Sequence, residues 1–353
     1  METSAIDRAR ATEFASGTTY LNTSTCGLMP RRAVEAVRTL VDQCAAGVRG
    51  GAGSAESVEA VRAGFARIAG VAPARVAVGG SVAAHAGLIA ASLPPGAEVL
   101  APTGEFSSVV SPFAVRGDLR MRYVPLAGLA DAVRPGTALV AFSAAQSADG
   151  RVADLDAVRA AAAAHGARTM LDASQSAGWL PLDAGAYDYT VTGGYKFLMG
   201  PRGTSFLTVT EEAQENLPPL YASWVAAEDP WSSTYGPVEK LAVDARRFDQ
   251  PVAFLAYHGA APSLDLLAAV GVDAVYTHAT GLAARFREGL ASIGYEAVPG
   301  TSAIVAVPGL GGREPGLAEA GVMVSARAGN LRAAFHLYNT GADVDRALDV
   351  LSG

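Results

Sequence analysis

The chain has 353 residues, half of them hydrophobic, and its 27 basic and 34 acidic residues give a net charge of -7. This length suits a large domain with a smaller one and allows a sizeable buried core. The acidic balance and the absence of basic runs exclude nucleic acid and anionic membrane surfaces as expected partners. No apolar stretch is long enough to predict a membrane span.

Signals for export and for metal binding are missing from the sequence. Residues 1–10 mix acids and bases without the apolar core of a signal peptide, so we expect a cytoplasmic protein. Cys26 and Cys44 are the two cysteines, and no Cys/His cluster has metal-ligand spacing. We therefore expect neither a metal nor a disulfide.

Apolar runs of strand type alternate with alanine-rich helical stretches along most of the chain. The expected strands are 75–78, 98–101, 120–124, 138–142, 169–171, 189–192 and 204–209. The expected helices include 32–46, 57–68, 83–92, 155–165 and 263–269. This alternation predicts an α/β fold with a mainly parallel sheet between two layers of helices. Ligands of such sheets bind beyond the carboxyl ends of the strands.

The alternation ends near residue 218. Residues 218–235 combine Pro, Ser and acidic residues with four aromatic ones and are expected to form a loop that could line a site; the aromatic residues are Tyr221, Trp224, Trp231 and Tyr235.

The last third of the chain has a different pattern. It begins with a helical run near Phe248 and continues with strand-like pieces and a last helix; these are 302–307, 322–325, 333–337 and 344–351. We therefore divide the chain into an N-terminal arm (1–20), a large domain (21–247) and a small α+β domain (248–353).

The stretch from Leu171 to Lys196 carries the most chemical information. Asp172 ends an apolar strand, where a buried charge needs a partner. Lys196 directly follows the next apolar strand, and adjacent strands would bring both residues to one edge of the sheet. An amine and a carboxylate so placed suit pyridoxal phosphate (PLP), which needs a Schiff base and a protonated pyridine nitrogen. A structural salt bridge or a solvated lysine is the alternative interpretation.

Five segments, in the same order, match motifs of one family. They are Tyr20-Leu21-Asn22 with Gly27–Pro30, Gly80-Ser81-Val82 before a helix, Glu105–Val109, Asp172–Gln175 with Gly194–Gly203, and Arg332–Thr340. Together they resemble the class V aminotransferases and cysteine desulfurases of the fold type I PLP enzymes. The resemblance covers most of the chain and implies a PLP-transferase fold, PLP as cofactor and a homodimer.

The resemblance also implies roles for the matched residues. Lys196 would bind PLP and, once the substrate has displaced it, remove the α-proton as a base. Asp172 would pair with the pyridinium nitrogen and Gln175 would bond the ring hydroxyl. The phosphate would lie at a helix N-terminus, on the turn formed by Gly80, Ser81 and Val82.

Further contacts follow from the same motifs. Phe106 would stack on the ring, although a core aromatic is the alternative. Gln146 or Ser147 could reach the ring hydroxyl or be ordinary loop residues, and Tyr195 could contribute its own hydroxyl.

The substrate side of the site is expected to use arginine. Arg327 is the first candidate for the substrate carboxylate and Arg332 the second, because guanidinium groups bind carboxylates bidentately. Surface arginines are the alternative for both. Asn22 is also assigned to the substrate side, whereas His85 and His336 are expected to be structural.

The sequence departs from the family at three points. Gly193 and Tyr195 replace the serine and histidine that reach the phosphate in many relatives. The run from Arg247 to Pro251 lacks the Gly-Thr-Pro whose threonine reaches the phosphate of a partner subunit. No cysteine follows Cys44, so a desulfurase that works through a cysteine persulfide is not expected.

The expected reaction is β-elimination by a C–S lyase that acts on an S-substituted cysteine and serves the biosynthesis of a sulfur-containing metabolite. Such an enzyme would be similar to ergothioneine-type lyases and would release pyruvate and ammonia. An aminotransferase, an isopenicillin-N-epimerase-like racemase and a kynureninase-like hydrolase stay open as alternatives. So does a catalytically silent relative, although the intact Asp172, Gln175 and Lys196 argue against it. The aromatic loop and Trp179 suggest a bulky or apolar substrate part.

Overall fold

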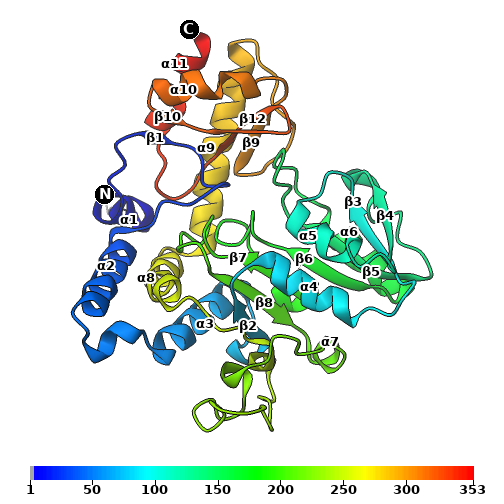
Figure 1. Ribbon diagram of the computed structural model, residues 1–353. Helices are drawn as coiled ribbons and strands as arrows, with labels where there is room; N and C mark the ends of the chain where they lie inside the picture. Colours follow the sequence, from blue (N-terminus) through cyan, green and yellow to red (C-terminus); the bar gives the residue numbers. More distant parts are fainter. Residues whose placement is uncertain (1–3) are drawn as a thin grey trace.

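A seven-stranded sheet forms the centre of the protein in a computed structural model that describes residues 4–353 (Figure 1). Its order is β2-β8-β7-β6-β5-β3-β4, and every neighbouring pair is parallel except the two pairs made by β8. The strands are β2 (Val76–Gly79), β3 (Glu98–Pro102), β4 (Arg120–Val124), β5 (Thr137–Ser143), β6 (Arg168–Asp172), β7 (Tyr189–Gly193) and β8 (Ser205–Val209). The predicted mainly parallel α/β sheet is confirmed, and its strands lie within two residues of the expected ranges.

Helices cover both faces of this sheet. They are α3 (Ala55–Ala69), α4 (Val82–Ser92), α5 (Ser107–Ala114), α6 (Leu155–His165), the short α7 (Glu211–Glu215) and α8 (Phe254–Val270). Helix α2 (Arg31–Ala45) packs against α8. Alternate residues of β5 show the two layers: Leu139 and Ala141 pack with α4 and α5, whereas Val140 and Phe142 pack with α6. Both faces are therefore apolar, which explains why these strands read as continuous hydrophobic runs.

Short polar residues and glycines set the helix ends. The Ser81 hydroxyl accepts a hydrogen bond from the Ala84 amide and caps α4, and Asp154 caps α6 in the same way. Helix α6 ends at Gly166 in the left-handed conformation, which costs glycine little. These local signals explain why the predicted bounds of α4 and α6 agree with the structure.

A smaller α+β unit lies on one side of the sheet and contains α9 (Figure 1). Its antiparallel sheet has the order β11-β12-β9, and a two-stranded parallel ribbon joins β1 to β10. The elements are β1 (Thr19–Tyr20), α9 (Val272–Ser292), β9 (Ile304–Val307), α10 (Glu314–Glu319), β10 (Val322–Met323), β11 (Ser325–Arg327), β12 (Asn330–Ala334) and α11 (Gly341–Ser352). The end of the N-terminal arm thus pairs with a strand from the last third of the chain.

Three expectations about elements were wrong or incomplete. Helix α9 was not expected, although Val275, Ala279 and Phe286 lie on its buried face, because Gly281 and Gly289 weaken its helical pattern. Helix α1 (Ala5–Glu13) lies in the N-terminal arm, for which no helix was listed. Helix α5 was also missed; Pro112 lies inside it.

The division at residue 247 stays a prediction. Helix α8 follows that boundary in sequence but packs on α2 and α3 of the large domain. Helix α9 then runs from α8 towards the small unit (Figure 1).

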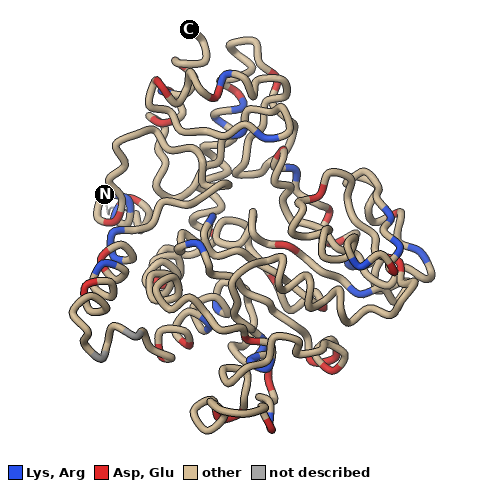
Figure 2. The backbone as a smooth tube through the Cα atoms, in the orientation of Figure 1, with Lys and Arg blue, Asp and Glu red and all other residues tan. Residues whose placement is uncertain are grey.

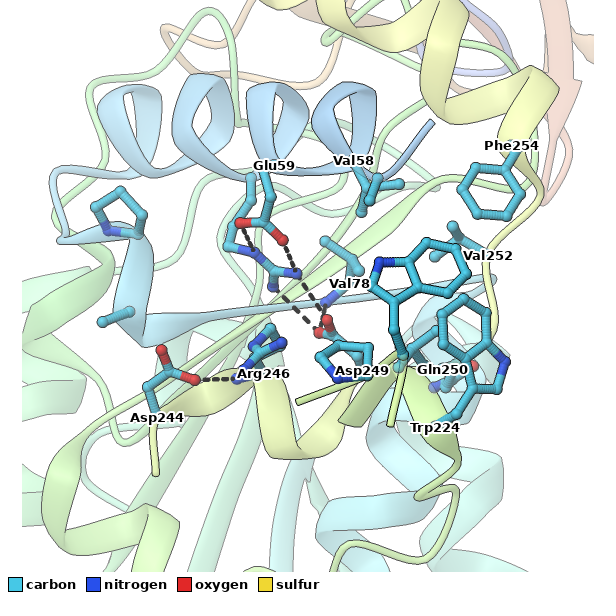
Figure 3. Close-up of a pocket in the computed structure, with 17 residues that line it drawn as sticks. Val58, Glu59, Val78, Trp224, Asp244, Arg246, Asp249, Gln250, Val252 and Phe254 are labelled. Atoms are coloured by element: carbon cyan, nitrogen blue, oxygen red, sulfur yellow. Dashed lines mark hydrogen bonds and ion pairs between the residues drawn. The ribbon is translucent and has the colours of Figure 1, made fainter. Parts of the chain in front are cut away.

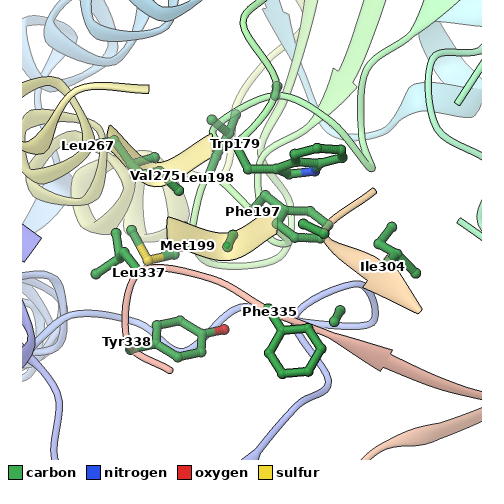
Figure 4. Packing of buried hydrophobic residues seen from close by; sticks show 14 of the residues in the cluster. Trp179, Phe197, Leu198, Met199, Leu267, Val275, Ile304, Phe335, Leu337 and Tyr338 are labelled. Carbon is green, nitrogen blue, oxygen red and sulfur yellow. The ribbon is translucent and has the colours of Figure 1, made fainter. Parts of the chain in front are cut away.

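One apolar core continues from the large sheet into the small unit, as Figure 4 shows for fourteen of its residues. Trp179 lies within it at 1% exposure, stacks on Tyr276 and donates its ring N–H to the Gln175 carbonyl at 2.7 Å. The expectation that Trp179 borders a bulky substrate is therefore wrong, because its ring is enclosed by the protein.

Neither the distribution of charge nor the hydropathy of the helices singles out one part of the molecule. Basic and acidic residues are interspersed over both parts of the chain (Figure 2). Within residues 4–353, no single helix is long and apolar enough to cross a membrane. Helices α8 and α9 reach that length and hydropathy only together, and the chain bends by 83° between them.

Candidate active site

Lys196 and Asp172 lie at the carboxyl edge of the large sheet. Asp172 is the last residue of β6, and Lys196 follows the neighbouring parallel strand β7. Their exposures are only 4% and 6%. Burial raises the pKa of Asp172, and the positive charge of Lys196 opposes that shift. Burial also lowers the pKa of Lys196 to about 8, although the negative charge of Asp172 opposes this shift. The two groups therefore stabilise each other's charged form in a site that water hardly reaches.

A tight turn fixes the backbone of Lys196. The Gly27 amide donates to the Tyr195 carbonyl at 2.9 Å, and a Cβ on Gly27 would lie 2.1 Å from the Lys196 carbonyl oxygen. Only glycine fits so close an approach. Met199, at the end of the turn, has a φ of 56°, a conformation that costs a non-glycine residue free energy. The N-terminal motif thus buttresses the lysine.

Ser174 holds the carboxylate of Asp172 in place. Its amide and hydroxyl donate to Asp172 Oδ1 at 2.8 and 2.6 Å, and its hydroxyl accepts from the Gly193 amide at 2.8 Å. No role for Ser174 was predicted from the sequence. The signal was present, because an aspartate two residues before a serine is typical of a side chain that bonds its own backbone two residues on.

One cavity joins Lys196 and Asp172 to the turn before α4. Its lining residues are Gly80, Ser81, Val82, Phe106, Ser108, Asp172, Ser174, Gly193, Tyr195, Lys196 and Thr204. A Cβ on Gly80 would meet no atom within 4 Å, so the backbone there faces open space. An amine, a carboxylate and a helix N-terminus therefore face one cavity, and this donor set fits PLP. Ser108 and Thr204 are lining residues that the sequence analysis missed.

Phe106 lies at the cavity rather than in the core. Its exposure is 40%, and Lys196 Nζ lies 5.1 Å from its ring centroid. The alternative of an ordinary core aromatic is thus wrong.

Glu105 supports this side of the cavity. Its buried carboxylate accepts from the Phe106 amide at 2.7 Å, from the Ser143 amide and hydroxyl at 2.8 and 2.6 Å, and from Gln146 Nε2 at 2.9 Å. The side-chain N–H of Gln146 is thereby committed to Glu105. No role for Glu105 was predicted from the sequence, although an acid shortly after a buried strand indicates a carboxylate that needs hydrogen-bond partners.

Gln175 has a vacant acceptor. Its Nε2 donates to the Ser24 carbonyl at 2.9 Å and to Ser147 Oγ at 3.1 Å, whereas its Oε1 is buried and has no partner among the described residues. Asn22 Oδ1 is in the same situation. Buried acceptors without a donor fit polar groups of a ligand.

Arg332 is enclosed by hydroxyl and carbonyl groups. At 1% exposure, it donates to Ser325 Oγ at 3.1 Å, to Thr25 Oγ1 at 2.9 Å and to both the hydroxyl and the carbonyl of Ser147. No carboxylate among the described residues pairs with it. Burial lowers the pKa of Arg332 to about 9. A buried guanidinium without an acid favours an anionic ligand.

Arg327 has a different environment. Its side chain is exposed, and it donates to the Ala326 carbonyl at 2.7 Å and to Thr25 Oγ1 at 3.4 Å. The first candidate from the sequence is thus exposed, whereas the second, Arg332, is buried among neutral oxygen atoms.

Tyr195 lies between two basic side chains. Its ring centroid is 4.4 Å from Arg202 Cζ and 5.8 Å from Lys196 Nζ. Gly193, another lining residue, offers no side chain. Tyr195 lines the cavity and keeps its expected place there.

The aromatic loop lines a second cavity, away from Lys196. Trp224 and Trp231 line it together with residues of α3, and Figure 3 shows Trp224, Glu59 and Asp249 around it. Arg62, another lining residue, forms an ion pair with Asp249 at 2.6 Å. Asp249 Oδ1 also accepts from the Val78 amide at 2.9 Å. The loop is therefore absent from the lining of the Lys196 cavity, and Asp249, further along the chain, anchors its own segment to β2.

His85 and His336 are structural, as expected. Both are fully buried; His85 Nε2 lies 3.0 Å from Ser205 Oγ, and His336 Nε2 lies 2.7 Å from the Phe197 carbonyl. Burial lowers the pKa of each to about 4.

These two histidines predict an acid-sensitive fold. An unfolded histidine takes up a proton below about pH 6.5, whereas each folded one stays neutral until about pH 4. The free energy of unfolding should therefore fall as the pH falls through this window, by on the order of 3 kcal/mol per histidine. Urea unfolding at several pH values measures the slope. His85→Gln should make it shallower, and an unchanged slope would contradict the assignment.

Comparison with known proteins places the chain in a family. The sequence model of the family described as aminotransferase class-V matches residues 20–309. The uncharacterized aminotransferase YcbU of Bacillus subtilis is 26% identical over 324 residues, with 84% of each protein covered. Isopenicillin N epimerase of Streptomyces clavuligerus is 28% identical over 342 residues, covering 83% of this chain and 84% of the epimerase.

A solved structure shares the fold. The complex of the cystine C–S lyase C-DES with its reaction product cysteine persulfide has a TM-score of 0.84 at 22% identity, covering 96% of this chain and 98% of the other. The family model covers more than half of the chain. The chain therefore belongs to the class V aminotransferase family, and with it to the enzymes that use pyridoxal 5'-phosphate.

Proposed function

We propose that the protein is a C–S lyase that cleaves an S-substituted cysteine conjugate by β-elimination, with pyruvate, ammonia and a thiol as products. The observation that carries this proposal is a buried amine and carboxylate, Lys196 and Asp172, in one cavity without a cysteine from the C-terminal part of the chain. A persulfide relay needs a thiolate. Elimination needs only a base and a leaving group, and the fold relative C-DES is itself a C–S lyase.

PLP supplies an electron sink for the negative charge that forms on the substrate's α-carbon. Lys196 Nζ accepts the α-proton, and its lowered pKa, about 8, leaves part of the amine unprotonated near neutral pH. Asp172, fixed by Ser174, keeps the ring nitrogen protonated. Gln175 Oε1, which has no internal donor, accepts from the ring hydroxyl.

The remaining contacts orient the cofactor and the substrate. The amides of Gly80, Ser81 and Val82 bind the phosphate, and Phe106 covers a face of the ring. Asn22 Oδ1 faces the substrate side. On family resemblance, the protein acts as a homodimer.

Arg332 holds the substrate's α-carboxylate. Replacing it with glutamine should lower kcat/KM by about 10²-fold, mainly through KM, because a buried partner of the carboxylate is lost. Steady-state kinetics with an S-alkyl cysteine measures this. Arg346→Gln, at an exposed arginine, serves as the matched control. A variant with unchanged KM would show that the carboxylate binds elsewhere.

An absorbance spectrum of the purified protein tests the reaction type. Adding an S-alkyl cysteine should shift the cofactor band while pyruvate accumulates. Conversion to the pyridoxamine form without pyruvate would instead indicate an aminotransferase, which the similarity to YcbU keeps as the alternative.

A further inference from the structure

We infer that the substrate carries a second anionic group besides its α-carboxylate, and that Arg327 and Arg202 bind this group at the mouth of the Lys196 cavity. This inference rests on the proposed function and specifies its substrate class. The class is a cysteine conjugate whose S-substituent ends in a carboxylate or a similar anion.

The first observation is that two guanidinium groups converge on one hydroxyl. Thr25 Oγ1 accepts from Arg332 Nη2 at 2.9 Å and from Arg327 Nη2 at 3.4 Å. Two positive charges that share one hydrogen-bond acceptor repel each other, and the repulsion is stronger when one of them is buried. Between residues 4 and 353, neither arginine forms an ion pair with a carboxylate. A bound anion would remove this repulsion.

Among the residues whose burial is described, Arg62 is also deeply buried, but its charge has acidic partners. Arg62, at 4% exposure, pairs with Asp249 at 2.6 Å and with Glu59 at 3.1 Å. An internal acid thus neutralises Arg62, whereas Arg332 has only neutral oxygen partners. The contrast indicates that the charge of Arg332 is kept for a ligand.

The second observation places Arg202 beside the same segment. Arg202 is exposed and lies over the Tyr195 ring, 4.4 Å from its centroid. Its charge acts on both Lys196 and Cys26, the residue after Thr25. Arg202, in the turn after β7, therefore lies over a residue that lines the Lys196 cavity, and Arg327 reaches Thr25 from the strand β11.

One α-carboxylate does not use three guanidinium groups. A carboxylate is bound by one bidentate arginine, and the buried Arg332 is placed for that role. The two remaining arginines are exposed, where the distal end of a substrate held at Lys196 and Arg332 would extend. A substituent that is only apolar would leave both charges without a partner, whereas a terminal anion would match them.

Two unreactive acids test this inference. Glutarate is butyrate with a second carboxylate, and neither compound carries the amine or sulfur that turnover needs. Calorimetric titration of the holoenzyme should show glutarate binding about 5- to 10-fold more tightly than butyrate. Arg327→Gln and Arg202→Gln should each reduce glutarate affinity by about 2- to 5-fold and leave butyrate affinity unchanged. Arg346→Gln should change neither affinity.

Three outcomes would overturn the inference. Glutarate binding no tighter than butyrate, or no detectable binding of either acid, would exclude a second anion site. Equal weakening of both acids by Arg327→Gln would place Arg327 on the first carboxylate. Because the probes do not react, a glutarate preference without pyruvate release from an S-carboxyalkyl cysteine would refute the lyase proposal alone.

Discussion

Replacing Lys196 with alanine is expected to abolish the cofactor's covalent linkage and to lower turnover by at least about 10⁴-fold. The amine has two roles, as the attachment point and as the base, and no other described group occupies its place at the end of β7. The absorbance spectrum and steady-state kinetics of the variant measure both losses. Full activity in this variant would contradict the assignment of Lys196 as the cofactor-binding residue and the base.

The chain offers a well-matched control, because Lys196 and Lys240 are its two lysines. Lys240 is exposed and pairs with Glu228 at 2.7 Å. Lys240→Ala should leave spectrum and turnover unchanged. Borohydride reduction of the wild-type holoenzyme, followed by peptide mass analysis, should find the cofactor on the Lys196 peptide, and a label on Lys240 would contradict the site.

Replacing Asp172 with asparagine is expected to lower kcat by about 10²–10³-fold while the protein still binds PLP. The amide has nearly the same shape but no negative charge to keep the ring nitrogen protonated. Binding of PLP should persist, because the phosphate turn before α4 and Lys196 remain. Titration with PLP and measurement of kcat separate the two effects.

A matched change next to Asp172 tests how much its orientation contributes. Ser174→Ala removes the hydroxyl that donates to Asp172 Oδ1 at 2.6 Å but leaves the charge. Its loss of kcat should be smaller than that of Asp172→Asn. A rate in Asp172→Asn close to that of the wild type would contradict the role of the carboxylate.

Much of the large domain could be predicted because its signals are local. Each buried strand is a short apolar run, and caps such as Ser81 and Asp154 mark the starts of helices. The chemistry of Asp172 and Lys196 followed from the same logic, since parallel neighbours end at one edge of the sheet.

The supporting contacts could not be predicted, because they join distant parts of the sequence. Thr25 and Arg332 are 307 residues apart, and Glu105 bonds Gln146 across 41 residues. The degree of burial could not be predicted either: Trp179 is enclosed in the core, Arg332 is buried and Arg327 is exposed. Such distinctions depend on packing, which a single sequence does not specify.

The buttress that the N-terminal motif provides also joins the two parts of the molecule mechanically. Gly27 is bonded to the turn of Lys196 in the large sheet, while Thr25, two residues earlier, is bonded to Arg332 in the small unit. The segment of residues 25–27 is too short to keep both hydrogen bonds if the two parts move apart. Opening of the small unit would therefore break one of these bonds, and the grip on the substrate would loosen together with the support of the lysine.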